Sequence, residues 1–423
     1  MKYFNPANLA VIACPGGEFF ANEVVVHLQN KYRHSRKQAV EEISKSYSMS
    51  PKQASLQIDL INKIVVRGAA SQSGTNRNCG KFKIPVKFTL FANGEIKSEI
   101  IESIRGMDVY IFQDVENHYP VKFSGGEVVN MTINDHLMAT FVTIDAARQA
   151  GAERITLVIP NYPYSRQHKS KGREGLSASR IGKIFESLGV NHIITLDIHS
   201  RDIMSAFNRM RLENLHASYQ IIQTLTKMDG ILNDDFVVVS PDTGAVDRNK
   251  FYASALKKPL ALLYKERDYS KHSRDASHSN ISQLRLLGSV KDKTVFMADD
   301  ILGTGGTLIK GMRLLKENGA RRIICAISLP LFSGNAISHF DEAYNEGLFY
   351  RIIGTNAVYQ EEVIKREWYE NVNISRLFAT VISRLHQNQS VSSLLDNARI
   401  INRLVSQTMV EDVQNELPFT IAE

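Results

Sequence analysis

Short apolar runs alternate with longer amphipathic segments along most of this chain. The apolar runs are nearly continuous stretches of Val, Ile and Leu, which is typical of strands covered on both faces of a sheet. We therefore predict buried strands within residues 9–14, 108–113, 154–160, 192–198, 236–241, 260–264, 294–300, 322–330 and 350–356. Helical patterns lie between them, over residues 134–150, 177–188, 304–318 and 335–345. The alternation predicts an α/β fold with mainly parallel sheets flanked by helices.

One pattern recurs along the chain: a helix ends near a glycine, and a buried strand follows. The glycines are Gly151, Gly189 and Gly319, each placed where a helix C-cap favours positive φ. The repetition suggests two related α/β halves joined near residues 215–235, although any protein of alternating strands and helices repeats this pattern.

Two segments look like additions to this plan. Residues 30–82 hold two polar helical stretches, the second opened by Ser50-Pro51, and end in a Gly/Ser/Asn-rich run. A mixed polar tail follows residue 395. Because a long surface insertion costs little closure entropy, we expect 30–82 to lie away from the functional site.

Composition narrows the partners and the compartment. A formal net charge of +7 favours anionic partners without choosing among them. Three distant cysteines, Cys14, Cys79 and Cys325, argue against a disulfide framework. No apolar run approaches membrane-spanning length, so we expect a cytoplasmic protein without a membrane partner. Basic residues interleaved with aromatics, as single-stranded nucleic acid requires, are missing, so no nucleic-acid partner is expected.

The most informative stretch is "MADDILGTGGT", residues 297–307. We predict that a strand ends at Asp299-Asp300 and that a helix starts near Thr304. Ligands of open α/β sheets bind beyond the carboxyl ends of the strands. There Thr304, Gly305, Gly306 and Thr307 can offer N–H groups and hydroxyls to a phosphate, while the acids accept sugar hydroxyls. The stretch therefore predicts a phosphorylated-sugar site; a helix cap with a Gly-rich loop is the weaker alternative.

Further motifs follow in a fixed order: "FANGE" (91–95), "SIRGMDVYIFQ" (103–113), the run from 134 to "YSRQ" (164–167), "HIITLDIHS" (192–200), "SPDTGAVDR" (240–248), "YKER" (264–267) and "LFSGNAISHF" (331–340). This order resembles the ribose-phosphate pyrophosphokinases, or PRPP synthetases, of the type I phosphoribosyltransferase fold. The resemblance covers nearly the whole chain apart from 30–82 and the tail.

The resemblance implies two phosphoribosyltransferase-like domains, each a mainly parallel sheet flanked by helices. The N-terminal domain would be 1–217, with the insertion 30–82 and joined by 390–423. The C-terminal domain, 218–389, would carry the ribose 5-phosphate loop. The implied reaction transfers the β,γ-diphosphoryl group of MgATP to the 1-hydroxyl of ribose 5-phosphate, giving PRPP and AMP. Mg²⁺ is then the cofactor, and a homo-oligomer, a dimer or a ring of dimers, is expected.

The resemblance assigns the ATP site. Phe91 would stack on adenine, with Asn93 and Glu95 at its polar edge, and this patch would reach a neighbouring subunit's site. Arg166 and Gln167 would contact ATP phosphate and base. The alternatives are a core aromatic for Phe91 and a solvated basic loop for Arg166.

It also assigns the metal and the pyrophosphate loop. Asp197 and His199 would contact magnesium and the ATP phosphates; a hard cation that keeps several waters needs few protein ligands. A lone His after a strand is ordinarily structural. Asp242, Thr243 and Gly244 match the pyrophosphate loop.

Lys265 and Arg267 would be the catalytic cations. They precede a polar segment, residues 268–280, whose composition suits a closing loop. Phosphoryl transfer depends mostly on stabilising charge on the transferred group, which suits these cations.

Three departures from the family pattern stand out: Gly303 where an acid usually precedes T-G-G-T, His168 and Lys171 where acids are usual, and "SRDIMSAFN" (200–208) after "DIH". They put phosphate and ADP regulation in doubt, and they favour a non-catalytic regulatory homologue as the alternative function. The retained Lys265 and Arg267 argue against it. A PRPP-consuming phosphoribosyltransferase ranks lower, because it has no use for "FANGE", "SRQ" and "KER" together.

Overall fold

The chain forms two compact units, which we describe separately. The computed structural model describes residues 6–70, 81–170, 172–228, 235–267, 281–395 and 398–406, by backbone alone over 61–70, 265–267 and 281–283. Unit 1 comprises Met1–Leu215, Ala357–Tyr359 and Ile374–Leu395. Unit 2 comprises His216–Asn356, Gln360–Asn373 and Asp396–Glu423. The domain boundary at 217/218 stays a prediction, as does the expectation that residues 390–423 join the N-terminal domain.

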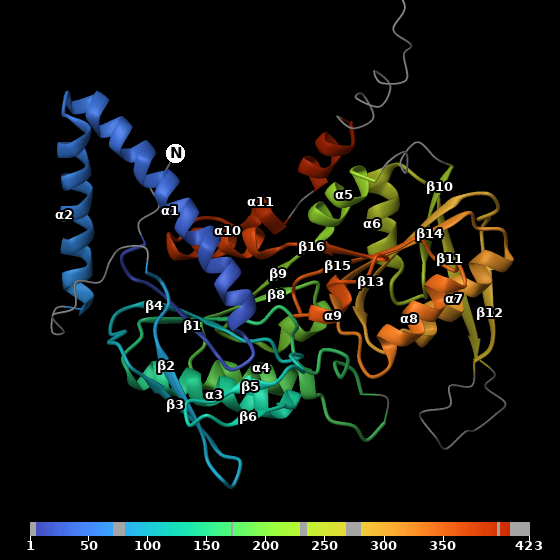
Figure 1. The fold of residues 1–423 in the computed structure, drawn as a ribbon, viewed down its shortest axis with the longest axis horizontal. Coiled ribbons are helices and arrows are strands. Elements are labelled where there is room, and N and C mark those ends of the chain that lie inside the picture. Colours follow the sequence, from blue (N-terminus) through green and yellow to red (C-terminus); the bar gives the residue numbers. More distant parts are fainter. Residues whose placement is uncertain are drawn as a thin grey trace, which may run out of the picture. The chain divides into compact units, whose positions relative to one another are not determined.

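Unit 1 is built on a five-stranded, fully parallel sheet in the order β1-β4-β7-β8-β9 (Figure 1). Its strands are β1 (Leu9–Ala13), β4 (Asp108–Phe112), β7 (Arg154–Val158), β8 (His192–Leu196) and β9 (Arg211–Leu215). Because all strands run the same way, the loops after β7 and β8 leave the sheet at one edge. These are the loops that carry Arg166 and Asp197.

Unit 1 also contains helices and two small hairpins. They are α1 (Glu18–Tyr47), α2 (Pro51–Ala70), the hairpin β2 (Val86–Leu90) and β3 (Ile96–Ile100), the hairpin β5 (Val121–Lys122) and β6 (Val128–Val129), α3 (Ile133–Gln149), α4 (Ser177–Ser187), the 3₁₀ helix η1 (Arg201–Ala206), α10 (Ser375–His386) and α11 (Ser392–Leu395). Sheet residues such as Ile111, Leu157 and Ile193 are fully buried with Ile144 of α3 and Phe185 of α4 in one core. Each such side chain contributes about 1.5–3 kcal/mol by its burial.

The first helical stretch of the insertion continues a helix that starts before residue 30. Helix α1 runs unbroken from Glu18 to Tyr47, so its first half packs in the core and its second half continues into the insertion. Arg36 of α1 bonds Ser55 (2.6 Å) and Asp59 (3.0 Å) of α2, holding the two helices together. The predicted second helix opens at Pro51, as expected.

Unit 2 contains a seven-stranded sheet in the order β12-β11-β10-β13-β14-β15-β16, parallel except for β12 (Figure 1). Its strands are β10 (Phe236–Ser240), β11 (Leu260–Arg267), β12 (Ile281–Leu287), β13 (Thr294–Leu302), β14 (Arg322–Pro330), β15 (Arg351–Thr355) and β16 (Tyr369–Val372). Its helices are α5 (Ser218–Thr226), α6 (Val246–Leu256), α7 (Gly306–Glu317), α8 (Ala336–Asn345) and α9 (Glu361–Ile364), and residues 398–406 are helical.

The predicted α/β pattern is confirmed. Every predicted strand and helix forms, and the three repeat glycines have φ of +81°, +89° and +85° at Gly151, Gly189 and Gly319. The expected strand end at Asp299-Asp300 is wrong, because β13 continues to Leu302 opposite Pro330 of β14. No helix in the described ranges is long and apolar enough to cross a bilayer.

Candidate active-site segments

The "FANGE" motif forms the tip of the β2–β3 hairpin in unit 1. Phe91 N–H donates to Glu95 O (2.9 Å), and Glu95 N–H donates to Asn93 Oδ1 (3.2 Å), so these residues close the turn among themselves. The Phe91 side chain is 47% exposed, which excludes the alternative of a core aromatic. Among the described residues, no hydrogen bond or ring contact joins this tip to the Arg166 or Asp197 loops. An exposed ring on a projecting hairpin is available to a ligand or to another chain.

The loop after β7 holds Arg166 and Gln167, both exposed. Tyr164, at φ +57°, turns the chain, and Gln167 N–H donates back to Tyr164 O (2.8 Å). The next residue, His168, packs against His199 with ring centroids 5.3 Å apart. The fold thus brings the Arg166 loop and the His199 loop together within unit 1.

Asp197 follows β8 in a left-handed conformation, with φ +41°. Its N–H donates to Leu215 O of the neighbouring strand (2.8 Å), and the residue is only 8% exposed, while His199 is exposed. Positive φ at a residue other than glycine costs about 1 kcal/mol or more and is concentrated at functional sites. The turn places one nearly buried carboxylate and one accessible imidazole at the same edge of the sheet.

Two segments that depart from the family pattern, residues 168–171 and 200–208, contact each other. Besides the His168–His199 contact, Lys169 pairs with Asp202 of η1 across 3.4 Å. Both partners are about two-thirds exposed, so this pair adds little stability. Lys171 lies outside the described residues.

Sequence reasoning missed an acid beside the Arg166 loop. Burial raises the pKa of Glu116, and the Arg166 charge and an Asn161 hydrogen bond (3.1 Å) lower it in part. Asp114, two residues earlier, is buried as well, and burial raises its pKa to about 7. Nothing in the local sequence pattern marks these acids, because their environment comes from loops distant in the chain.

In unit 2, the pyrophosphate-loop motif forms the turn between β10 and α6. Asp242 Oδ1 accepts the N–H groups of Gly244 (2.9 Å) and Ala245 (3.1 Å), and so closes the turn that precedes α6. Thr243 and Gly244 are exposed. The Asp242 carboxylate therefore shapes the loop, and the exposed turn is what a ligand can meet.

Two residues at the start of α6 tie this loop to the strand of the acid pair. The buried Asn249 side chain accepts from Ala298 N–H (2.9 Å) and donates to Ala298 O (2.8 Å). Arg248 Nη2 lies 3.8 Å from Asp300 Oδ2. Arg248 stands at the end of the quoted "SPDTGAVDR" motif, yet its spacing gives no sign that it meets Asp300. The fold brings the predicted pyrophosphate and ribose 5-phosphate segments together.

Asp299 and Asp300 are adjacent carboxyl groups with little exposure to solvent, which makes it costly for both to be ionised. Burial and the charge of Asp300 raise the pKa of Asp299, and Arg248 lowers it in part. Asp300 is 7% exposed. Each carboxylate accepts the next backbone N–H, Asp300 N–H at 2.9 Å and Ile301 N–H at 3.0 Å. These bonds fix both side chains at the end of β13, where hydrogen-bond donors of a bound sugar would lower the cost of two adjacent charges.

The T-G-G-T loop opens helix α7. Thr304, Gly306 and Thr307 are exposed, and the helix begins at Gly306, after Gly305 at φ +74°, without a side-chain cap. A helix of 12 residues leaves its first backbone N–H groups without partners inside the helix, and these favour an anion. A Cβ on Gly305 would lie 2.3 Å from the Phe340 ring, so glycine is required there.

The side chains of Lys265 and Arg267 lie outside the described residues. Their backbones belong to β11, paired with β12 as Lys265 with Leu284 and Arg267 with Ile281. The register slips between Glu266 and Arg267, so the regular alternation of the strand is interrupted next to Arg267.

Comparison with known proteins identifies the architecture. A family model of the N-terminal domain of ribose phosphate pyrophosphokinase matches residues 68–189, and a phosphoribosyl transferase domain model matches residues 209–348. Ribose-phosphate pyrophosphokinase A of Dictyostelium discoideum is 33% identical over 311 residues, covering 73% of this chain and 89% of that protein. The chain belongs to the ribose-phosphate pyrophosphokinase family.

Two further comparisons agree with this membership. The ribose-phosphate pyrophosphokinase of Mycoplasma pneumoniae is 30% identical over 80% of this chain and 96% of its own length. The crystal structure of phosphoribosylpyrophosphate synthetase from Mycobacterium smegmatis matches with a TM-score of 0.65 at 25% identity, covering 90% of this chain and 99% of that one. The predicted fold class, two phosphoribosyltransferase-type domains, and the predicted ribose-phosphate diphosphokinase function are confirmed.

Proposed function

We propose that this ribose-phosphate pyrophosphokinase binds ribose 5-phosphate on the end of β13 and the start of α7. The observation that carries the proposal is a contact between two motifs of unit 2: Arg248, in the first turn of α6, lies 3.8 Å from Asp300 of β13, and the uncapped α7 follows β13 in the chain. The 5-phosphate would take the N–H groups and hydroxyls of the T-G-G-T loop. Asp299 and Asp300 would accept the ribose hydroxyls.

ATP is assigned to the segments of unit 1. Phe91 offers an exposed ring for adenine, with Asn93 and Glu95 beside it. Because the hairpin projects, it could reach the ATP site of a neighbouring subunit in a homo-oligomer. Arg166 and Gln167 would hold ATP from the loop after β7. The cytoplasm is the compartment we assign to this enzyme.

The residues of unit 1 could hold Mg²⁺ provided that ATP phosphates and waters supply the remaining ligands. No group of three or more His, Cys, Asp or Glu side chains in the described part of the chain could hold a metal by itself. Mg²⁺ usually keeps several waters and binds through one or two carboxylates plus substrate phosphates, which suits the nearly buried Asp197 with His199 beside it. Bound there with ATP, the cation would neutralise charge on the phosphate oxygens.

The chain's own residues then position and stabilise the transfer. The ribose 1-hydroxyl attacks the β-phosphorus of ATP and its proton passes to water. The bond between the β-phosphorus and the α,β-bridging oxygen breaks, and AMP departs with the electron pair of that bond. Lys265 and Arg267, at the end of β11, would neutralise the charge that accumulates on the transferred group. Asp242, Thr243 and Gly244 would hold the transferred diphosphoryl group, since the turn after β10 is tied to β13 by Asn249.

The direct test supplies the purified protein with ribose 5-phosphate, MgATP and inorganic phosphate and follows AMP and PRPP. Equal rates of the two products are expected. Arg267→Ala should lower turnover by at least about 10²-fold, with a smaller change in ATP affinity, because its charge acts mainly in the transition state. AMP formation without PRPP would refute the assignment. A turnover of Arg267→Ala near that of the wild type would remove Arg267 from the catalytic set.

A further inference from the structure

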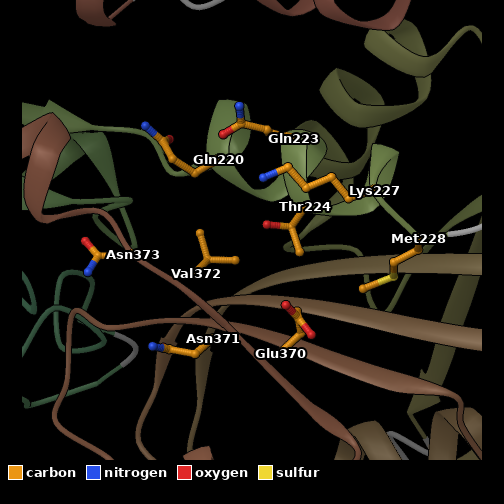
Figure 2. Close-up of a pocket in the computed structure, with 9 residues that line it drawn as sticks. All are labelled: Gln220, Gln223, Thr224, Lys227, Met228, Glu370, Asn371, Val372 and Asn373. Atoms are coloured by element: carbon orange, nitrogen blue, oxygen red, sulfur yellow. The ribbon is translucent and has the colours of Figure 1, made fainter. Parts of the chain in front are cut away.

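A polar pocket in unit 2 lies outside all of the motifs assigned to the reaction. It has a volume of about 350 Å³ and lies between α5 with the two residues after it and strand β16 with the one residue after it (Figure 2). Volumes of this order suit small-molecule ligands. Its lining residues are Gln220, Gln223, Thr224, Lys227, Met228, Glu370, Asn371, Val372 and Asn373.

The pocket meets the open edge of the sheet. Strand β16 is the last strand in the sheet order, and four consecutive residues, 370–373, line the cavity. Side chains of a strand alternate between its faces, so consecutive residues can share a cavity only where it abuts the strand's edge. A ligand there can reach main-chain groups as well as side chains.

The register shows which main-chain groups those are. Ile352 N–H donates to Trp368 O (2.9 Å) and Asn356 N–H donates to Val372 O (3.0 Å), so even-numbered residues of β16 bond to β15. Asn371 then directs its N–H and C=O outward, and neither bonds any described residue. One donor and one acceptor therefore lie side by side on the pocket wall.

Carboxamides dominate the side chains around that edge. Gln220 and Gln223 of α5 line the pocket together with Asn371 and Asn373 of the strand segment, and each amide carries both donors and an acceptor (Figure 2). The Gln220 Oε1 atom is shielded from solvent and accepts no hydrogen bond from any described residue. Such an atom is costly unless a water or a ligand donates to it.

The remaining lining residues form an apolar group and a polar or charged group. Val372 and Met228 supply apolar and polarisable surface, which suits the face of a flat ring. Lys227 from the α5 side offers a cation, while the Glu370 carboxylate and the Thr224 hydroxyl offer groups that can bond sugar hydroxyls (Figure 2). Amide pairs and a main-chain donor–acceptor pair match the edge of a purine, as Asn and Gln do for adenine in nucleic acids.

We infer that this pocket binds a purine nucleoside monophosphate. The base lies against Val372 and Met228, with its edge on the Asn371 main chain and the carboxamides. The ribose meets Glu370 and Thr224, and the phosphate meets Lys227. None of the lining residues belongs to the segments proposed for ATP and ribose 5-phosphate, and the inference holds whether or not those assignments do.

The probe is 8-azido-AMP, photolysed on the full-length protein and mapped by mass spectrometry. Label is expected in peptides containing residues 218–228 or 369–373, and unlabelled AMP should suppress it. Labelling at these peptides should fall at least tenfold in the double variant Gln223→Leu/Lys227→Met. Lys291→Met, an exposed lysine on another loop of unit 2, is the matched control and should label like the wild type.

Equilibrium dialysis with radiolabelled AMP tests the same site without photochemistry. The wild type should show one more class of AMP sites per chain than the double variant, at an unchanged melting temperature. Should that variant unfold, Gln220→Leu alone replaces it. Label confined to other peptides, label undiminished in the variants, or occupation by an extended peptide that AMP does not displace would each overturn the inference.

Discussion

Arg248 and Asp300 form an ion pair across 3.8 Å that joins the start of α6 to the C-terminal part of β13. The arginine also lowers the pKa of the neighbouring Asp299, against burial and the charge of Asp300, which raise it. The ionisation of the acid pair therefore depends on a residue of helix α6.

Replacing Arg248 with Met should move the acid limb of the pH profile upward. The folded-state pKa of Asp299 is already raised, so ionised acid is lost as the pH falls through that value, and removing the cation raises the value further. The measurement is kcat/KM for ribose 5-phosphate against pH. Arg248→Lys, which keeps the charge, should stay near the wild-type profile; an unmoved limb in the Met variant would show that the pair does not control binding.

Asp300→Asn should weaken ribose 5-phosphate far more than ATP. A hydrogen bond to a charged acceptor contributes about 1.5–3 kcal/mol, which corresponds to roughly 10- to 100-fold in KM for the sugar. The KM for ATP should change less than about threefold. Asp292→Asn is the matched control, since Asp292 is exposed at φ +60°, a conformation that Asn tolerates. Equal losses for both substrates would point to a metal or folding role.

Two adjacent glycines of the α7 loop should respond differently to alanine. Gly305→Ala places a Cβ 2.3 Å from Phe340 at φ +74°, so we expect a loss of about 2–3 kcal/mol in the free energy of unfolding. Gly306→Ala meets nothing within 4 Å and should change stability by less than about 1 kcal/mol. Thermal unfolding of both variants compares them directly, and equal destabilisation would contradict this view of the loop.

The interior of each sheet could be predicted from sequence, whereas most of its edges could not. Strands covered on both faces have continuous apolar runs, so β4, β7, β10 and β13 were recognisable. The edge strands β9 ("RLENL") and β16 ("YENV") are half polar, because one side of each lacks a neighbouring strand. The sequence pattern therefore gives no indication of the pocket beside β16.

The site divides in the same way. A contiguous motif such as the T-G-G-T loop could be placed from sequence, since glycine requirements and helix starts are local. The roles of Arg248 and Glu116 could not be predicted, because their partners Asp300 and Arg166 lie far away along the chain. The end of β13 was misplaced, since its length is set by pairing with β14 through Leu302 opposite Pro330.

Asp108 is a buried acid at the start of β4. It accepts hydrogen bonds from Arg154 Nε (2.8 Å) and the Tyr110 hydroxyl (3.0 Å), and its Oδ2 lies 2.8 Å from His386 Nδ1 of α10. Arg154 also donates to Leu385 O (3.0 Å), so the acid holds α10 against the sheet. Burial would raise the pKa of Asp108, but its bonds from Arg154 and His386 outweigh that effect and lower it.

A folded-state pKa below the unfolded one stabilises the protein above the unfolded value, near 3.9 for Asp, and this contribution is lost as the pH falls through the folded value. Asp108→Asn should therefore destabilise unit 1 by about 3 kcal/mol at neutral pH, since it leaves Arg154 without its buried partner. The loss should shrink below about pH 4. Hydrogen exchange of residues 375–386 should accelerate in this variant and stay unchanged in Asp145→Asn, an exposed acid of α3. Unchanged protection of α10 in Asp108→Asn would show that apolar packing alone holds this helix.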